Sequence, residues 1–168
     1  MLEPLACVDA HYTDSAASVA CVLFQAWDAA APLQVLTSRH GAAQAYEPGA
    51  FYKRELPLLL AVLDRLTRQP GTVIVDGYVW LDGGRPGLGA MLYRALGERI
   101  PVIGVAKTQF AGATAGIPVV RGGSRRPLYV SAVGIDAAEA ARGAEAMHGP
   151  HRIPTLLHLA DRAARDAL

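Results

Sequence analysis

The sequence contains few cysteines and few lysines. Its two cysteines, Cys7 and Cys21, lie in short apolar segments and lack the regular spacing of a disulfide framework. We expect both to be buried free thiols in a reducing compartment, which makes the cytoplasm the expected location. Lys53 and Lys107 are the only lysines, so the basic residues are nearly all arginine.

Neither sign of charge predominates. The sequence has sixteen lysines and arginines and fifteen aspartates and glutamates, which gives a net charge of +1. This balance excludes an overall positive electrostatic field, the feature that would indicate nucleic-acid binding from net charge alone.

Long hydrophobic runs are absent as well. No apolar segment approaches the length of a transmembrane helix, and no basic leader opens the chain, so we expect neither a membrane span nor a signal peptide. The 168 residues, 52% of them hydrophobic, suffice for one well-packed core. We therefore expect a single domain over residues 1–168 and a monomer.

Hydrophobic patterning predicts alternating groups of strands and helices. A helix is expected to begin near Pro57, because proline is tolerated in the first turn, and its leucines at helical spacing would form one buried face. The expected strands are 5–11, 18–27, 33–39, 72–78, 101–107, 117–121 and 128–133, and the other expected helices are 87–99, 136–147 and 155–167.

This order of elements predicts an α/β protein. Three closely spaced strands favour an antiparallel meander, and the later strand–helix–strand unit favours parallel pairing. The pattern corresponds to a ribonuclease H-like fold: a mixed central sheet, three antiparallel strands and then parallel ones, with helices on both faces.

Four acids fall where such a sheet would gather them: Asp9, Glu55, Asp76 and Asp161. Burying an ionised carboxylate inside a strand is costly, and a shared divalent cation would offset that cost. The alternative is that the four acids are separate surface or capping residues. This alternative is stronger for Asp161, which has arginines beside it, than for the strand residues Asp9 and Asp76.

Other polar side chains have two open interpretations each. Lys107 ends a strand and could stabilise phosphate charge, or could simply be a solvated strand-end lysine. Tyr46, on a loop, could stack on a base or cover the core. A basic cluster around Arg121, with Arg125 and Arg126, could contact a phosphate backbone, although a solvated hairpin tip is slightly preferred.

The histidines show no zinc-binding spacing. His11 follows Asp9 on the same strand face and could support it. His158 could meet Asp161 on a helix.

Seven segments, taken in order, resemble the endonuclease V family. They read VDAHY, YEPGAFYKRE, VDGY, GLGAMLY, PVIGVAKT, RPLYVSAVG and HRIPTLLHLAD, and cover the chain from Val8 to Asp161. The resemblance implies a ribonuclease H-like DNA repair nuclease. Such an enzyme uses Mg²⁺, or Mn²⁺ in its place, to hydrolyse the second phosphodiester bond 3′ of deoxyinosine in DNA, and some members cut inosine-containing RNA.

The resemblance also implies roles for individual residues. The metal-binding acids fall on Asp9, Glu55 and Asp76, the late acidic or histidine position on Asp161, and the catalytic lysine on Lys107. Contacts with the substrate and its extruded base fall on Tyr46, Pro48, Gly49, Phe51, Gly77, Gly87 and Arg85.

Three departures from the family pattern concern the substrate. Val79 replaces a glycine and should narrow access to the backbone, while Asp82 stands where the family has a histidine. Glu47 adds a negative charge to residues 46–49, which the resemblance aligns with the family's wedge motif. The N-terminal helical segment of longer members is not seen. Two alternatives follow: the same hydrolysis on inosine-containing RNA or another altered nucleic acid, and a non-catalytic nucleic-acid-binding homologue.

Overall fold

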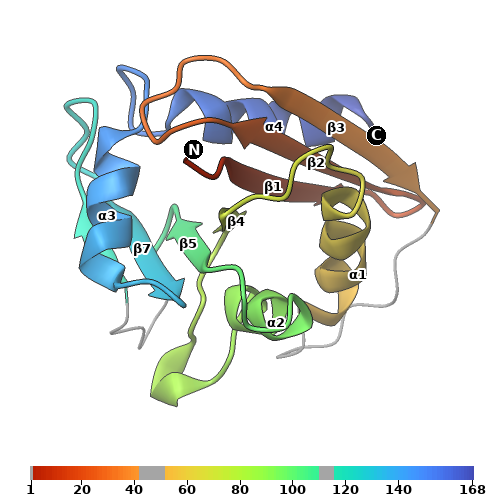
Figure 1. Cartoon of the computed structure of the whole chain (residues 1–168), viewed down its shortest axis with the longest axis horizontal. Coiled ribbons are helices and arrows are strands. Elements are labelled where there is room, and N and C mark those ends of the chain that lie inside the picture. The colour runs from red at the N-terminus through yellow and green to blue at the C-terminus, as the bar shows by residue number, and fades with distance from the viewer. Residues whose placement is uncertain (1, 42–51, 110–115) are drawn as a thin grey trace.

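A computed structural model of the chain describes residues 2–41, 52–109 and 116–168. The strands and helices follow one another along the chain in the order that the sequence predicts (Figure 1). The strands are β1 (Leu5–Tyr12), β2 (Ala17–Phe24), β3 (Gln34–His40), β4 (Thr72–Asp76), β5 (Val102–Ala106), β6 (Ile117–Val119) and β7 (Leu128–Val133). The helices are α1 (Tyr52–Leu63), α2 (Leu88–Ala95), α3 (Ala137–Ala146) and α4 (Thr155–Asp166), with a short 3₁₀ turn, η1 (Asp82–Gly84).

The seven strands form one mixed sheet in the order β3-β2-β1-β4-β5-β7-β6. The first three pair antiparallel, as predicted, and β4 joins β1 in parallel and β5 joins β4 in parallel. The predicted hairpin of β6 and β7 extends the sheet beyond β5 with antiparallel pairing. The carboxyl ends of β1, β4 and β5 therefore meet at one edge, the position where open α/β sheets place their sites.

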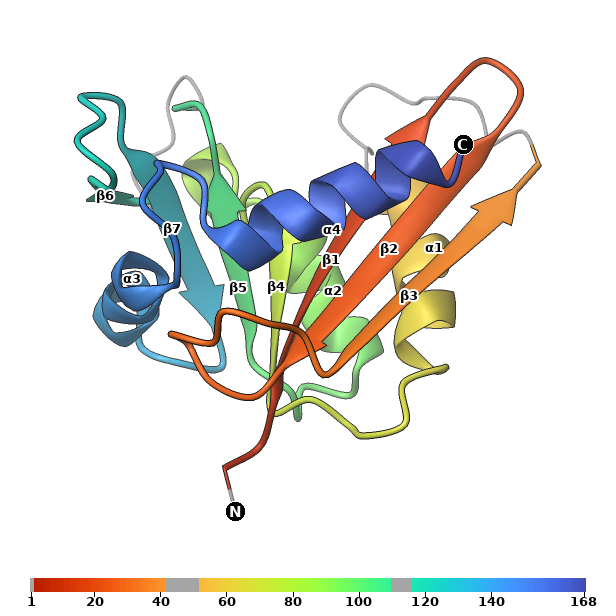
Figure 2. The same ribbon diagram turned by 90° about the horizontal axis from the view of Figure 1, so that it is seen from above.

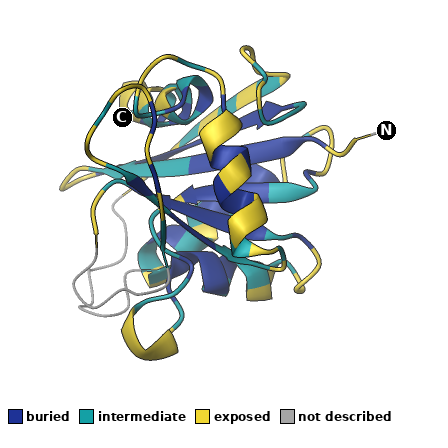
Figure 3. Ribbon diagram, turned by 90° about the vertical axis from the view of Figure 1, so that its left-hand side faces the viewer, coloured by how far each residue is buried: buried dark blue, intermediate teal, exposed yellow. Residues whose placement is uncertain are grey.

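The helices cover both faces of the sheet. Figures 1 and 2 show α1 and α2 on one side and α3 and α4 on the other, with α4 running across β1 and β2. Alternate strand residues feed two cores: Leu5 and Cys7 of β1 pack toward α3 and α4, and Ala6 and Val8 pack toward α1 and α2. Figure 3 shows the resulting buried middle of the molecule between exposed helix faces.

Helix α1 corrects one prediction. It is already helical at Tyr52, so the expectation of a start near Pro57 is wrong, and Pro57 lies inside the helix. Proline removes one backbone hydrogen bond there. Burial of Leu59, Val62 and Leu63 along one face offsets that loss, because tertiary packing supplies most helix stability in proteins.

Strand β4 ends two residues earlier than predicted. It stops at Asp76 because Gly77 adopts a φ of +125°, a conformation that L side chains rarely adopt. The chain therefore turns away directly after the acid, which leaves Asp76 at the sheet edge.

The basic cluster near the β6–β7 hairpin is also corrected. Arg121 is buried, and its guanidinium donates hydrogen bonds to the backbone carbonyls of Glu145, Met147, Gly149, His151 and Arg152. Neither the solvated tip nor a phosphate contact describes this side chain. Arg125 and Arg126 remain exposed.

No helix in the described ranges is both long and apolar enough to cross a membrane.

Candidate active site

Two polar side chains at the end of β1 face helix α4. Strand alternation places Asp9 and His11 on the same side as Leu5 and Cys7, the side that α4 covers. The Asp9 carboxylate also accepts a hydrogen bond from the backbone N–H of Ala10 at 2.9 Å, which orients it. Both side chains thus stand at the sheet edge, beneath the last helix.

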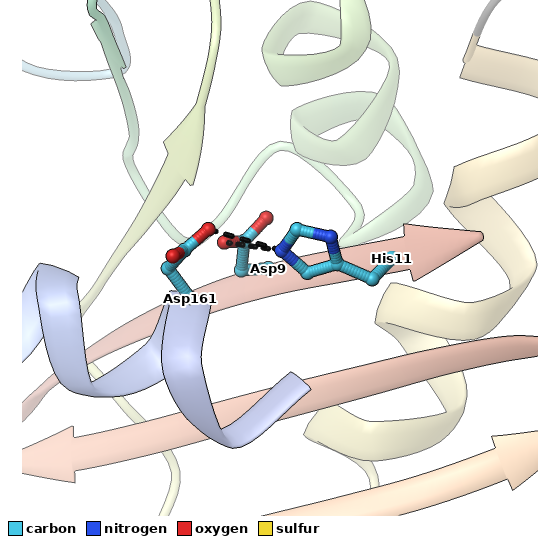
Figure 4. A group of neighbouring side chains, drawn as sticks. All are labelled: Asp9, His11 and Asp161. Atoms are coloured by element: carbon cyan, nitrogen blue, oxygen red, sulfur yellow. Dashed lines mark hydrogen bonds and ion pairs between the residues drawn. The ribbon is translucent and has the colours of Figure 1, made fainter. Parts of the chain in front are cut away.

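Asp161 of α4 completes a compact group with them. His11 Nε2 lies 3.0 Å from Asp161 Oδ1 and 3.9 Å from Asp9 Oδ2 (Figure 4). One ligand atom from each of the three residues lies within 4.8 Å of the others. Asp161 Oδ2 also forms an ion pair with Arg165 Nε at 3.2 Å, so Asp161 pairs with a neighbouring arginine as well as with His11. His158 is exposed on the same helix.

Asp76 and Lys107 meet at the ends of adjacent parallel strands. Asp76 pairs in register with Val105, which places Lys107 just past the end of β5 on the same edge. Lys107 Nζ lies 3.4 Å from Asp76 Oδ2, and both side chains are partly open to solvent. The predicted juxtaposition of this lysine with this acid is therefore present in the structure.

Glu55 reaches the same edge from α1. It is only 8% exposed, and its carboxylate makes no hydrogen bond with the described residues, although the charge of Arg54 lies close to it. A pocket of about 450 Å³ is lined by Asp9, Glu55 and Asp76, together with His11, Tyr12 and Arg54. The structure thus brings three of the four predicted acids to one pocket, while Asp161 joins Asp9 through His11.

The clustered acids perturb one another. Burial, with the charge of Asp76 adding to it, raises the pKa of Asp9 to about 7. Burial and the charges of Asp9 and Asp76 raise the pKa of Glu55 to about 8. Burial alone would raise the pKa of Asp161, but its hydrogen bond with His11 and the charges of Lys107 and Arg165 outweigh burial and lower it.

This donor set suits a divalent cation. The Glu55 carboxylate shares one pocket with those of Asp9 and Asp76. With all three ionised, the pocket would hold an excess of negative charge that a bound cation would neutralise. Carboxylate oxygens are the ligands that Mg²⁺ and Mn²⁺ prefer.

Gly77, Gly87 and Arg85, which were predicted to contact substrate, are not among the residues that line this pocket. A Cβ on Gly77 would meet nothing within 4 Å, so the backbone there is open to a ligand. A Cβ on Gly87 would lie 2.6 Å from the carbonyl oxygen of Tyr78, so packing alone demands glycine at that position. Arg85 lies on the exposed η1 turn and forms an ion pair with Asp82.

Val79 is fully buried. Its side chain packs against Gly89 of α2, and its backbone N–H donates to Ser131 Oγ at 3.0 Å. The departure from glycine at this position is therefore accommodated inside the core. The residues predicted to form the wedge and the base pocket lie outside the described residues: Tyr46, Glu47, Pro48, Gly49 and Phe51.

Sequence reasoning underestimated three pocket residues. The sequence indicates only a supporting role for His11, through the strand face that it shares with Asp9. Tyr12 and Arg54 received no role, yet both line the pocket, with the Arg54 guanidinium carbon 3.8 Å from the centre of the Tyr12 ring.

Comparison with known proteins assigns the chain to a family. The sequence model of the family described as Endonuclease V matches residues 2–162. The chain belongs to the endonuclease V family. A curated endonuclease V from Streptomyces avermitilis is 34% identical over 144 residues, covering 73% of this chain and 62% of that protein. The first two curated relatives are matched over only 39% and 62% of their own length.

Solved structures of endonuclease V have the same fold. The crystal structure from Streptomyces avermitilis has a TM-score of 0.79 at 28% identity and covers 98% of this chain and 80% of that chain. The Ciona intestinalis enzyme, crystallised with DNA containing an inosine followed by a ribo-adenosine, has a TM-score of 0.81 at 15% identity and covers 98% of this chain and 85% of that chain. The ribonuclease H-like fold predicted from the sequence is thereby confirmed.

The perturbed acids give this endonuclease V-type site an unusual pH dependence. In the folded metal-free protein, Asp9 and Glu55 keep protons up to about pH 7 and pH 8, whereas the ordinary values are 3.8 and 4.5. The folded state thus binds more protons than the unfolded chain, and stability falls as pH rises from about 4 to about 8. A divalent ion that binds only the folded state should restore a few kcal/mol near the upper end of this range.

Thermal unfolding with a chelator and with excess Mg²⁺ or Mn²⁺, at several pH values in this range, measures the effect. The Glu55→Gln variant is the control and should show a shallower decline without metal. Metal-free stability that rises with pH across this window would contradict the assignment of a strained acidic cluster.

Proposed function

We propose that the protein is a divalent-metal-dependent nuclease that hydrolyses a phosphodiester bond 3′ of deoxyinosine in DNA. One observation carries the proposal: Asp9, Glu55 and Asp76 line a single pocket at the carboxyl-terminal edge of the sheet in a member of the endonuclease V family. The pocket is open enough to admit a phosphate group together with its metal.

The acids have separate roles in this proposal. Asp9, Asp76 and Glu55 hold the cation, with Asp161 as a further carboxylate on the α4 side. Mg²⁺, or Mn²⁺ in its place, supplies a water nucleophile of lowered pKa and neutralises charge at the reacting phosphate. The raised pKa values of Asp9 and Glu55 fall when the cation replaces the missing positive charge, so both acids act ionised.

Lys107 supplies a mobile positive charge. Its ammonium group is 3.4 Å from Asp76 and partly exposed, so it is positioned at the site without being buried in it. From this position the ammonium group would contact a phosphate bound at the acids and stabilise the charge that develops there.

The substrate assignment has its own support. The Ciona intestinalis relative was crystallised on inosine-containing DNA, and the open backbone at Gly77 beside the acids would allow close approach of an extruded base. The other proposed substrate contacts remain those that the family resemblance implies: Tyr46, Pro48, Gly49, Phe51, Gly87 and Arg85. We propose the cytoplasm as the location and a single domain as the organisation.

A second substrate is inosine-containing RNA. The ligand of the Ciona intestinalis relative carries a ribonucleotide directly after the inosine. A site that admits a 2′-hydroxyl at that position would also accept RNA, where the 2′-hydroxyl distinguishes the two nucleic acids.

Four matched oligonucleotides test the proposal: DNA with deoxyinosine, RNA with inosine, and both sequences with adenine at that position. We expect cleavage 3′ of the inosine in DNA with Mg²⁺ or Mn²⁺, and none with chelator. Preferential cleavage of the inosine RNA would move the assignment to the second substrate. Binding without cleavage under either metal would identify a non-catalytic homologue and overturn the proposal.

A further inference from the structure

His11 occupies an unusual position for a side chain with a merely supporting role. Its Nε2 atom points between the carboxylates of Asp9 and Asp161, which come from β1 and α4 (Figure 4). The three side chains are 24%, 13% and 18% exposed, so they are largely withdrawn from water. A nitrogen donor thus stands between two oxygen donors in a poorly solvated place.

The distances fit ligands of one ion. Donors bound at about 2.1 Å to an octahedral cation lie about 3.0 Å apart at neighbouring positions and about 4.2 Å apart at opposite positions. The observed separations from His11 Nε2 are 3.0 Å to Asp161 Oδ1 and 3.9 Å to Asp9 Oδ2. Both fall within the span of a single coordination sphere.

A separate observation indicates that a cation belongs at the neighbouring carboxylates, in a pocket that His11 also lines and Asp161 does not. Glu55 lines that pocket and is 8% exposed, and its carboxylate makes no hydrogen bond with another side chain or backbone group of the described residues. If Asp9, Asp76 and Glu55 hold one cation, the donors of His11 and Asp161 are available to a second cation.

We propose that His11 is a nitrogen ligand of a divalent ion held with Asp9 and Asp161, so that Asp9 is shared between two cation positions. The inference rests on the proposed metal-dependent function. Two ions that share a carboxylate can bind opposite sides of one phosphate, an arrangement used for in-line displacement.

The nitrogen donor determines which ions this subsite prefers. Mg²⁺ takes oxygen ligands and loses its waters reluctantly, whereas first-row transition ions accept imidazole readily. The Asp9–His11–Asp161 subsite should therefore bind Mn²⁺ more tightly than Mg²⁺. For His11 to bind an ion through Nε2, the proton of the neutral imidazole must lie on Nδ1. The ion would then replace the direct contact between His11 Nε2 and Asp161 Oδ1.

Pulsed electron paramagnetic resonance of the Mn²⁺-loaded full chain tests the proposal directly. We expect hyperfine coupling from Mn²⁺ to an imidazole nitrogen, with a shift on isotopic labelling of histidine. In His11→Gln the coupling should disappear and the Mn²⁺ affinity should fall roughly 10- to 100-fold, the loss typical of a damaged metal site, while Mg²⁺ affinity changes less.

His158→Gln is the matched control. It removes an exposed histidine from α4, three residues before Asp161, and should leave coupling and affinity unchanged. Wild-type protein without nitrogen coupling, or His11→Gln with coupling retained, overturns the proposal and leaves His11 as an ion-pair partner of Asp161. The coupling in wild-type protein needs no variant, so misfolding of His11→Gln would not remove the test.

The two hypotheses fail separately. Metal binding is measured without nucleic acid, so a protein that shows the coupling but cleaves no inosine substrate would refute the proposed function alone. Inosine-dependent cleavage without the coupling would refute the role of His11 alone.

Discussion

Asp76→Asn is expected to reduce cleavage of the deoxyinosine substrate by about a thousandfold. Asp76 lines the pocket with Asp9 and Glu55, at the end of the strand beside Lys107. Its loss removes one of the proposed charged metal ligands and the acid that pairs with Lys107. Metal ions contribute several kcal/mol to such reactions, and about 4 kcal/mol corresponds to three powers of ten in rate. Single-turnover cleavage with saturating Mg²⁺ measures the effect.

The same substitution should not weaken the fold. The Asp76 side chain is 44% exposed, and its charge raises the pKa of both Asp9 and Glu55. Removing that charge relieves repulsion, so the metal-free variant should unfold at the same temperature as wild type or higher. This combination of lost activity and retained stability is typical of functional sites.

Asp64→Asn serves as the matched control. Asp64 is exposed directly after α1 and does not line the pocket, so the same chemical change there should leave both rate and stability unaltered. Near-normal turnover by Asp76→Asn would refute the assignment of the site, whatever the substrate.

Arg121→Ala is expected to cost roughly 3–5 kcal/mol of unfolding free energy, the range for breaking a buried charged network. The guanidinium of Arg121 joins the end of α3 to the segment that leads into α4, through several backbone carbonyls. Alanine would leave these buried acceptors without a donor. For a chain of this size the loss should lower the melting temperature by roughly 6–20 °C.

Arg125→Ala, four residues away and exposed, is the control for Arg121→Ala. It should change the melting temperature little, because surface substitutions away from special features are usually within about 0.5 kcal/mol. Equal stability of the two variants, in thermal or denaturant unfolding, would mean that Arg121 does not connect these segments as the structure indicates.

Local patterns predicted most of the fold. Short apolar runs predicted β1 and β4, and the structure buries residues 5–8 and 73–75 of these runs. Asp136 caps α3 by accepting a hydrogen bond from the backbone N–H of Glu139. The errors have local physical reasons: Pro57 is tolerated inside α1 because packing outweighs one lost hydrogen bond. β4 stops at Asp76 because Gly77 adopts a positive φ.

The candidate site was only partly predictable. Topology brings Asp9, Asp76 and Lys107 to one edge, and that follows from strand order alone. The rotation of α4, which places Asp161 over His11 while His158 faces solvent, depends on packing against β1 and β2, and a single sequence does not contain that information. The burial of Arg121 was hidden for the same reason, since its partners are backbone carbonyls, which carry no sequence signature.

The contact between His11 and Asp161 joins residues 150 positions apart. A ribosome must therefore synthesise nearly all of the described chain before the two sides of the site can meet. A nascent chain would present Asp9 and Asp76 without their partner from α4, beside whatever nucleic acid surrounds the translation machinery. Completion of the site by α4 would delay its assembly until the chain has been synthesised through Asp161.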